Sequence, residues 1–247
     1  METQPSALSP QPSTVRINAF LASAGLGSRR AVERLVLEGR VQVNGSIIRE
    51  LSHRVDPSHD QVTCDGKPAL PASLRYVMLN KPRGYACTRS DPHGGKTIYD
   101  LLPVELRHLA HAGRLDVDSE GLLLLSNDGD WIFKLTHPSN EVAKTYVVEV
   151  EGEPDRQTLE KAQLGIQSQG ERLKVESVTK LERTGRVTRL KLILREGKNR
   201  EIRRIFGALH HPVISLRREA VGKLKLGALK SGAWRELEKG ELLAAGC

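Results

Sequence analysis

The chain has 247 residues, a formal net charge of +8 at pH 7 and a pI of about 9.5. This length suffices for one sizeable core plus a small additional module, and the basic balance points to a polyanionic partner, most simply nucleic acid. No apolar run is long enough to span a membrane, and the spacing of Cys64, Cys87 and Cys247 argues against a disulfide framework or a zinc site. We therefore expect a cytosolic protein with reduced thiols that needs no metal and no cofactor.

Positive charge is concentrated in two separate blocks. Between Arg16 and Arg54, seven arginines stand against three glutamates. Between Arg186 and Arg235, fourteen lysines or arginines stand against three glutamates. Two basic blocks far apart in the sequence predict two contacts with one long anion.

The N-terminal quarter predicts a tail followed by a small basic module. Residues 1–14 are rich in Pro, Ser and Gln and carry no apolar or basic leader, so we expect a disordered tail and not a signal peptide. Residues 15–64 then show the order helix, turn, helix, hairpin. Gly25 is placed to end the first helix, Ser28 to cap the second, and Asn44-Gly45 to form the hairpin turn.

Arginines gather on the second helix of this module. Their guanidinium groups can pair with RNA phosphates and follow the shape of the RNA more than its sequence. The pattern Arg-x-x-x-Phe-Leu-Ala-x-Ala-Gly-x-Gly-Ser-Arg-Arg through Gly-Arg-Val-x-Val-Asn-Gly resembles the alpha-L RNA-binding module shared with ribosomal protein S4. A solvated basic face on some other interaction module is the alternative. The arginines concerned are Arg29, Arg30, Arg34 and Arg40.

A Pro-rich stretch, residues 65–73, breaks both periodicities and predicts a linker to a second domain, residues 74–243. The first strand of that domain, Tyr76–Asn80, leads into a turn with two cations, Lys81-Pro82-Arg83-Gly84. The elements expected after it are a short helical segment at Ile98–Leu102, a helix containing Trp131 and Leu135 that Pro138 ends, and an alternating strand, Lys144–Val150, with Tyr146, Val148 and Val150 on one face.

One loop of this domain combines an arginine with three carboxylates. The stretch Gly113–Gly121 contains Arg114 and Asp116 and precedes the four leucines Leu122–Leu125. A leucine run between Gly121 and the Asn-Asp-Gly turn predicts a short strand buried on both faces. The loop is therefore anchored in the core and presents carboxylates beside a cation, as acid/base or nucleophilic chemistry requires. An ordinary solvated turn is the alternative.

The C-terminal part predicts more sheet and a second basic surface. We expect a helix over Pro154–Gly165 and an antiparallel pair formed by Arg172–Lys180 and Arg186–Leu194. After a turn at Gly197, apolar residues at three-four spacing predict a helix that packs on the sheet. Its start carries an RNA-facing group of cations, namely Lys198, Arg200, Arg203 and Arg204.

Three motifs resemble one enzyme family. They are Lys-Pro-x-Gly after the first strand, Gly-Arg-Leu-Asp with Ser-Glu-Gly-Leu-Leu-Leu-Leu and Asn-Asp-Gly, and Gly-Lys-x-x-x-Ile-Arg-Arg. In this order they resemble the bacterial rRNA pseudouridine synthases that join an alpha-L module to a catalytic domain, and the likeness covers residues 15–243. We expect an α+β fold: the small helical and hairpin module, and a catalytic domain with a mixed, largely antiparallel sheet and flanking helices.

The resemblance implies roles for single residues. Asp116 would be the catalytic aspartate, Tyr146 would stack on the target uracil and act in proton removal, and Arg203 would form an ion pair with Asp116. From the residues alone, Tyr146 would be a core residue. Arg114 would hold the flipped nucleotide, with Lys81 and the cations after Gly197 as further RNA contacts. Glu201 stands where many relatives carry Gln, which touches no catalytic role.

The chemistry that the family performs agrees with this composition. Pseudouridylation breaks the bond from uracil nitrogen to ribose, turns the base and joins its carbon to the ribose, so all atoms are retained and no second substrate is needed. Asp116 could attack the ribose or abstract a proton from it, and both remain open. We expect a monomer acting on a uridine of rRNA, 23S in preference to 16S. The alternatives are a synthase for 16S rRNA or tRNA, or a non-catalytic ribosome-binding or assembly protein, for which Asp116 would not matter.

Overall fold

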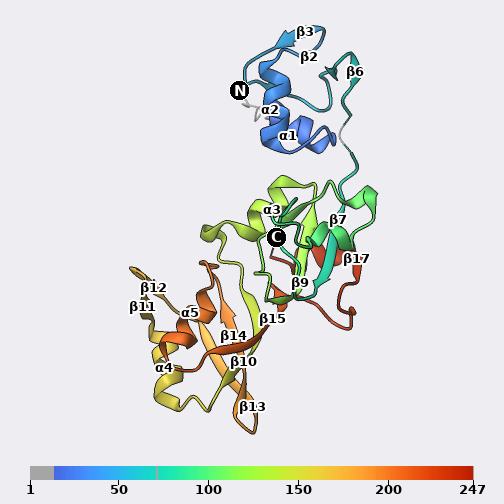
Figure 1. The fold of residues 1–247 in the computed structure, drawn as a ribbon. Coiled ribbons are helices and arrows are strands. Elements are labelled where there is room, and N and C mark those ends of the chain that lie inside the picture. The colour runs from blue at the N-terminus through green and yellow to red at the C-terminus, as the bar shows by residue number, and fades with distance from the viewer. Residues whose placement is uncertain (1–13, 71, 247) are drawn as a thin grey trace, which may run out of the picture. The chain divides into compact units, whose positions relative to one another are not determined.

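The computed structural model describes residues 14–70 and 72–246, so the predicted tail lies, apart from Thr14, outside the described residues. The chain divides into two compact units, the first ending at Leu74 and the second beginning at Arg75 (Figure 1). None of the described helices is long and apolar enough to cross a membrane. Cys64 and Cys87 are free thiols, whereas Cys247 is outside the described part.

The first unit has the predicted order of helix, turn, helix and hairpin. The Ser28 side chain accepts a hydrogen bond from the backbone nitrogen of Ala31 and so caps the second helix as predicted. Apolar residues of both helices, including Ile17 and Val32, pack against the sheet. Its elements are β1 (Val15–Arg16), α1 (Ile17–Ser23), α2 (Arg29–Leu37), β2 (Val41–Val43), β3 (Ser46–Ile48), β4 (Arg54–Val55), β5 (Val62–Cys64) and β6 (Lys67–Pro68).

Part of the stretch that the sequence suggested as a linker is folded. β5 and β6 form an antiparallel hairpin and add two strands to the β2–β3 pair. Asp65 and Gly66 connect them, both with positive φ, at 50° and 74°. The dipeptide Asp-Gly is a strong sequence signal for a hairpin turn of this kind. The prolines that follow it led instead to the prediction of a linker.

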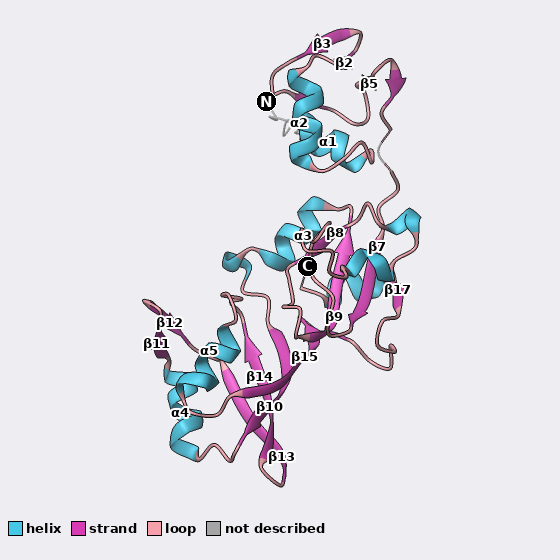
Figure 2. Cartoon of the chain, in the orientation of Figure 1, coloured by secondary structure: helices cyan, strands magenta, loops and turns pink. Residues whose placement is uncertain are grey.

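The second unit contains a nine-stranded sheet, and its mixed, largely antiparallel character confirms the predicted fold class (Figures 1 and 2). Among the described strands, only β15 and β9 pair in parallel, through Arg217 with Glu120 and Arg218 with Gly121. In sheet order the strands are β13 (Ser177–Thr184), β14 (Val187–Leu194), β10 (Lys144–Glu151), β15 (Val213–Val221), β9 (Glu120–Ser126), β7 (Tyr76–Lys81) and β17 (Trp234–Glu236), while β8 (Ala110–Ala112) pairs with β9 and β16 (Leu224–Lys225) with β15.

The leucine run forms β9, an interior strand of this sheet that is buried on both faces as predicted. Leu122 and Leu124 pack into one apolar cluster, and Leu123 and Leu125 into another on the opposite face. All four side chains are at most 1% exposed. The loop that precedes β9 is therefore attached to a strand that is buried on both faces.

Helices cover the sheet, and α5 packs on β15 and the β11–β12 hairpin. The predicted strand at Arg172–Lys180 is wrong at its start, because Glu171–Leu173 instead forms β12, paired with β11 (Ile166–Ser168), and β13 begins only at Ser177. The helices are α3 (Gly129–Thr136), α4 (Arg156–Leu164), α5 (Glu201–Ala208) and α6 (Lys239–Ala244), with 3-10 turns at Ile98–Leu101, Val104–Leu106 and Pro138–Asn140.

Candidate active site

A buried lysine fixes the loop that carries Asp116. Lys81, at the end of β7, has no exposed surface, and its ammonium group donates hydrogen bonds to the backbone carbonyl oxygens of Asp116 at 2.9 Å and Ser119 at 2.7 Å. The backbone nitrogen of Gly84 donates to the Val117 carbonyl at 2.8 Å. Burial lowers the pKa of Lys81. The Lys-Pro-x-Gly turn thus holds the backbone of the Asp116 loop from beneath.

Lys81 was predicted to contact RNA, but in this structure its side chain faces the interior of the protein. Lysine is rarely buried, so the sequence favoured an exposed cation. Here three carbonyl oxygens, including that of Pro82 at 3.2 Å, compensate for its lost hydration.

Replacing Lys81 by methionine should destabilise the loop and slow the reaction. The carbonyl oxygens of Asp116 and Ser119 would lose their donor, at about 1–3 kcal/mol for each buried acceptor left unpaired. Urea unfolding and RNA turnover should both reveal the loss. Lys134→Met, an exposed change on α3, is the matched control. Equal stability and turnover in the two variants would show that Lys81 does not support the loop.

One pocket of about 260 Å³ contains the three residues that the sequence analysis assigned to catalysis. Asp116 and Arg114 come from the loop before β9, Tyr146 from β10, and Arg203 from the first turn of α5. Leu216 and Ile202 provide apolar surface, and the pocket also contains Lys198 and Arg200. Residues from positions 113 to 216 thus meet in one place.

The ion pairs at this pocket differ from the predicted one. Arg203 contacts the Asp118 carboxylate at 3.1 Å, and its guanidinium also donates to the Asp118 carbonyl oxygen at 3.2 Å. Asp116 instead pairs with Arg200, at 3.6 Å. Within the described residues no ion pair joins Arg203 to Asp116, so that predicted contact is absent from this structure. Two carboxylates, 116 and 118, share two arginines.

Arg200 and Arg203 have different surroundings. The Arg203 side chain is 13% exposed, and burial lowers its pKa, while the nearby Asp118 carboxylate opposes this shift. Arg200 is exposed, lies within 3.4 Å of Asp118, and has a positive φ of 48°, which is uncommon for a residue other than glycine. Arg200 can therefore leave its partners more easily than Arg203 can.

Two further predicted RNA contacts are occupied by protein partners. Arg204 pairs with Glu171 at 2.6 Å, donates to the Ser168 carbonyl and is only 12% exposed, so it fastens the β11–β12 hairpin to α5. In this structure Arg204 therefore has a structural role, and its predicted RNA contact stays a prediction. Lys198 pairs with Glu196 at 2.8 Å, although it still lines the pocket.

Among the arginines predicted to contact RNA in the first unit, one is bound to a protein carboxylate and three are exposed without an ion pair to a described residue. The Arg40 guanidinium makes two hydrogen bonds to the Asp65 carboxylate, at 2.8 and 2.6 Å. A phosphate would have to displace Asp65 to reach the same nitrogen atoms. Arg29, Arg30 and Arg34 are exposed on α2 and form no ion pair with any residue of the described ranges. These three remain candidates for RNA contact.

The contacts and burial of three residues near the site did not follow from the sequence. Asp118 was counted only as one of the loop carboxylates, although it holds Arg203. Glu201 is 5% exposed and accepts a hydrogen bond from the Lys198 backbone nitrogen at 3.1 Å, which fixes the turn before α5, and burial raises its pKa. Arg218 is also 5% exposed, and its spacing gave no signal of burial.

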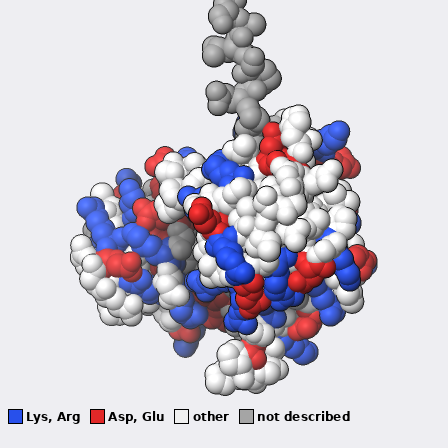
Figure 3. All heavy atoms as spheres, turned by 90° about the horizontal axis from the view of Figure 1, so that it is seen from above, with Lys and Arg blue, Asp and Glu red and all other residues white. Residues whose placement is uncertain are grey.

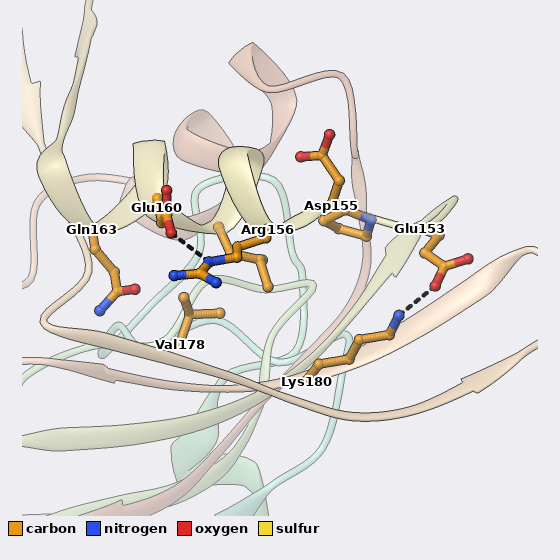
Figure 4. A pocket seen from close by; sticks show the side chains of 9 residues that line it. Glu153, Asp155, Arg156, Glu160, Gln163, Val178 and Lys180 are labelled. Carbon is orange, nitrogen blue, oxygen red and sulfur yellow. Dashed lines mark hydrogen bonds and ion pairs between the residues drawn. The ribbon is translucent and has the colours of Figure 1, made fainter.

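A larger cavity lies elsewhere in the described part of the chain. It measures about 720 Å³ and is lined by residues before and along α4 and by β13 (Figure 4). Most of its charges are in ion pairs, Glu153 with Lys180 and Arg183, and Arg156 with Glu160, whereas the Asp155 carboxylate accepts a hydrogen bond from the Thr158 backbone nitrogen and caps α4. Positive and negative side chains are likewise interspersed on the face that Figure 3 presents. This cavity contains neither the Asp116 loop nor Tyr146 nor Arg203, so the residues assigned to catalysis meet only in the smaller pocket.

Comparisons with known proteins agree with the motifs. The family model described as RNA pseudouridylate synthase matches residues 75–208, and the S4 domain model matches residues 15–62. A protein of Aquifex aeolicus (strain VF5) named "Uncharacterized RNA pseudouridine synthase" is 42% identical over 229 residues, or 92% of each chain. The ribosomal large subunit pseudouridine synthase B of Bacillus subtilis (strain 168) is 38% identical over 229 residues, 92% of this chain and 93% of that protein.

A solved structure described as a pseudouridylate synthase is also similar. It has a TM-score of 0.66 and 28% sequence identity, and the match covers 94% of this chain and 99% of the other. The similarity therefore extends over both units and is not limited to one motif.

Proposed function

The chain belongs to the RNA pseudouridylate synthase family, in the RsuA/RluB branch that carries an S4 domain, and from this premise we propose that it converts a specific uridine of 23S rRNA to pseudouridine. The observation that carries the proposal is the meeting of Asp116, Tyr146 and Arg203 in one pocket. The choice of 23S rRNA is supported by the 38% identity to a relative named for the large ribosomal subunit.

In this proposal Asp116 acts on the ribose or on one of its protons, with Arg200 beside its carboxylate at 3.6 Å. The target uridine leaves the RNA stack, and its base lies on the Tyr146 ring, a contact worth about 1–3 kcal/mol. Tyr146 then assists removal of the proton from the base carbon that has joined the ribose. Exposed Arg114 makes no ion pair with the described residues and holds the flipped nucleotide.

The reaction is tested with full-length protein and transcribed 23S rRNA, 16S rRNA and tRNA, each labelled with tritium at uracil carbon 5. Isomerisation releases this tritium, so release from 23S rRNA alone is the expected result. Release from 16S rRNA or tRNA alone would assign a different substrate. No release from naked RNA or from isolated ribosomal subunits would favour a binding or assembly protein.

The S4 domain is proposed to supply affinity and not chemistry. Replacing both Arg29 and Arg30 by alanine should weaken 23S rRNA binding and reduce the slope of log affinity against log salt by about 1.4, or 0.7 for each phosphate that is no longer neutralised. The single-turnover rate at saturating RNA should be spared. Arg156→Ala, which removes an exposed helical arginine from α4, is the control. A loss of the chemical step equal to the loss of binding would contradict this division.

A further inference from the structure

A second pocket adjoins the active site. It measures about 170 Å³ and shares Arg114, Tyr146, Glu196 and Gly197 with the pocket of Asp116. Tyr146 therefore contributes to both. The residues that line only the second pocket include the cations Lys144, Arg195 and Arg218 and the apolar Leu124, Leu135 and Val221.

Strand geometry explains why these cations meet beside Tyr146. Lys144 lies two positions before Tyr146 on β10, and alternate residues of a strand share a face. Arg218 lies directly opposite Tyr146 on β15, and directly opposed residues also share a face. Lys144, Tyr146 and Arg218 thus project from one side of the sheet.

The Arg218 guanidinium is only partly satisfied. Its Nε donates to the Leu122 carbonyl oxygen at 2.7 Å, which ties β15 to β9. Its Nη2 atom is buried and finds no hydrogen-bond partner among residues 14–70 and 72–246. A buried, unpaired donor on a charged group is costly and rare in native proteins. Because the Arg218 side chain also lines the pocket, a rotation of its guanidinium group would bring this donor to an oxygen atom of a ligand there.

No lining carboxylate is available to neutralise this site. Glu196, the acidic residue of the pocket, already pairs with Lys198 at 2.8 Å, and Arg195 is held by Glu176 at 2.7 Å. Arg114, Lys144 and Arg218 remain without an acidic partner in the described chain. Burial lowers the pKa of Lys144, and the positive charge of Arg218 lowers it further. Cations that repel one another in a half-enclosed pocket are stabilised when an anion enters.

We propose that this basic pocket, defined by Arg114, Lys144 and Arg218, binds an internucleotide phosphate of the substrate RNA next to the target uridine. The inference rests on the proposed function, because the pocket directly continues the one that would hold the flipped base. The phosphate would fix the backbone on one side of Tyr146 while the uracil is held on the other. Lys144 and Arg218 are thereby assigned to substrate binding.

The test starts from Lys144, which can be changed without disturbing the β15–β9 junction. In full-length protein that carries Asp116→Asn to prevent turnover, Lys144→Gln should weaken binding of the substrate RNA about tenfold. Lys144→Arg should restore most of the affinity. Lys191→Gln is the matched control, because Lys191 lies opposite Val147 and so on the other face of the same sheet. Equal affinities of the Lys144→Gln and Lys191→Gln proteins would overturn the inference.

Neutral methylphosphonates identify the phosphate. In a set of substrate RNAs, each phosphate that flanks the target uridine is replaced in turn by a methylphosphonate. The affinity of each RNA is then measured for the Asp116→Asn protein and for the Asp116→Asn, Lys144→Gln double variant. We expect one position at which the substitution weakens binding when Lys144 is present and has little further effect when it is absent. Additive losses at every position would overturn the proposal, even if inorganic phosphate bound to the free protein in a phosphorus NMR titration.

Failure of the proposed function looks different. If wild-type protein releases no tritium from any RNA, both the proposed function and this inference fail. If wild-type protein converts its RNA but every methylphosphonate loss is additive with Lys144→Gln, the function stands and the phosphate site does not.

Discussion

Replacing Asp116 by asparagine is expected to abolish isomerisation, lowering the single-turnover rate about 10³-fold or more. Asparagine keeps the shape of the side chain but cannot act as a nucleophile or as a base. RNA should still bind, because the basic residues around the pocket are unchanged. Tritium release under single-turnover conditions measures the rate, and filter binding measures the affinity.

Asp118→Asn is the informative comparison for that variant. Asp118 lies two residues further along the same loop and holds Arg203 at 3.1 Å, so its loss should disturb the position of Arg203 without removing the reacting group. We expect a smaller loss of rate than with Asp116→Asn. Full activity of Asp116→Asn combined with an inactive Asp118→Asn would move the catalytic role to Asp118.

The second large effect is expected at Gly121. A β-carbon at this position would lie 2.7 Å from the backbone nitrogen of Arg218, on the neighbouring strand, and would overlap its carbonyl oxygen as well. Gly121 also has a φ of 105°, which side chains rarely adopt. Gly121→Ala should therefore lower the free energy of unfolding by about 3–5 kcal/mol, combining overpacking with backbone strain.

The matched control is Gly207→Ala on α5. A β-carbon there meets no atom within 4 Å, and alanine favours the helix by about 0.5–1 kcal/mol over glycine. In urea unfolding, the free energy of unfolding should therefore be highest for Gly207→Ala, intermediate for wild type and lowest for Gly121→Ala. A Gly121→Ala protein as stable as wild type would show that β15 and β9 do not pair closely at this point.

Local patterns were enough to predict most elements of the fold. Ser28, Asn44-Gly45 and the run Leu122–Leu125 each carry their information within a few residues, as a cap, a turn and a buried strand. The Asp65-Gly66 hairpin was hidden by the prolines around it. The short β11–β12 hairpin was missed because three-residue strands give too little alternation to read.

The unexpected contacts at the site arise from interactions between distant parts of the chain. Lys81 is buried because carbonyl oxygens 35 to 38 residues away surround it, and Arg204 is occupied because Glu171 lies on a hairpin that the sequence did not reveal. Arg203 pairs with Asp118 and not with Asp116, although the two aspartates are only two positions apart in one loop. Composition and spacing predict which charges gather, whereas three-dimensional packing decides which of them pair.

The most direct test of the central claim is chemical mapping of pseudouridine across rRNA from cells that lack this gene, complemented with either wild type or Asp116→Asn. We predict one missing pseudouridine in 23S rRNA, restored by wild type and not by the variant. Restoration by Asp116→Asn, or a complete set of pseudouridines without the gene, would contradict the account.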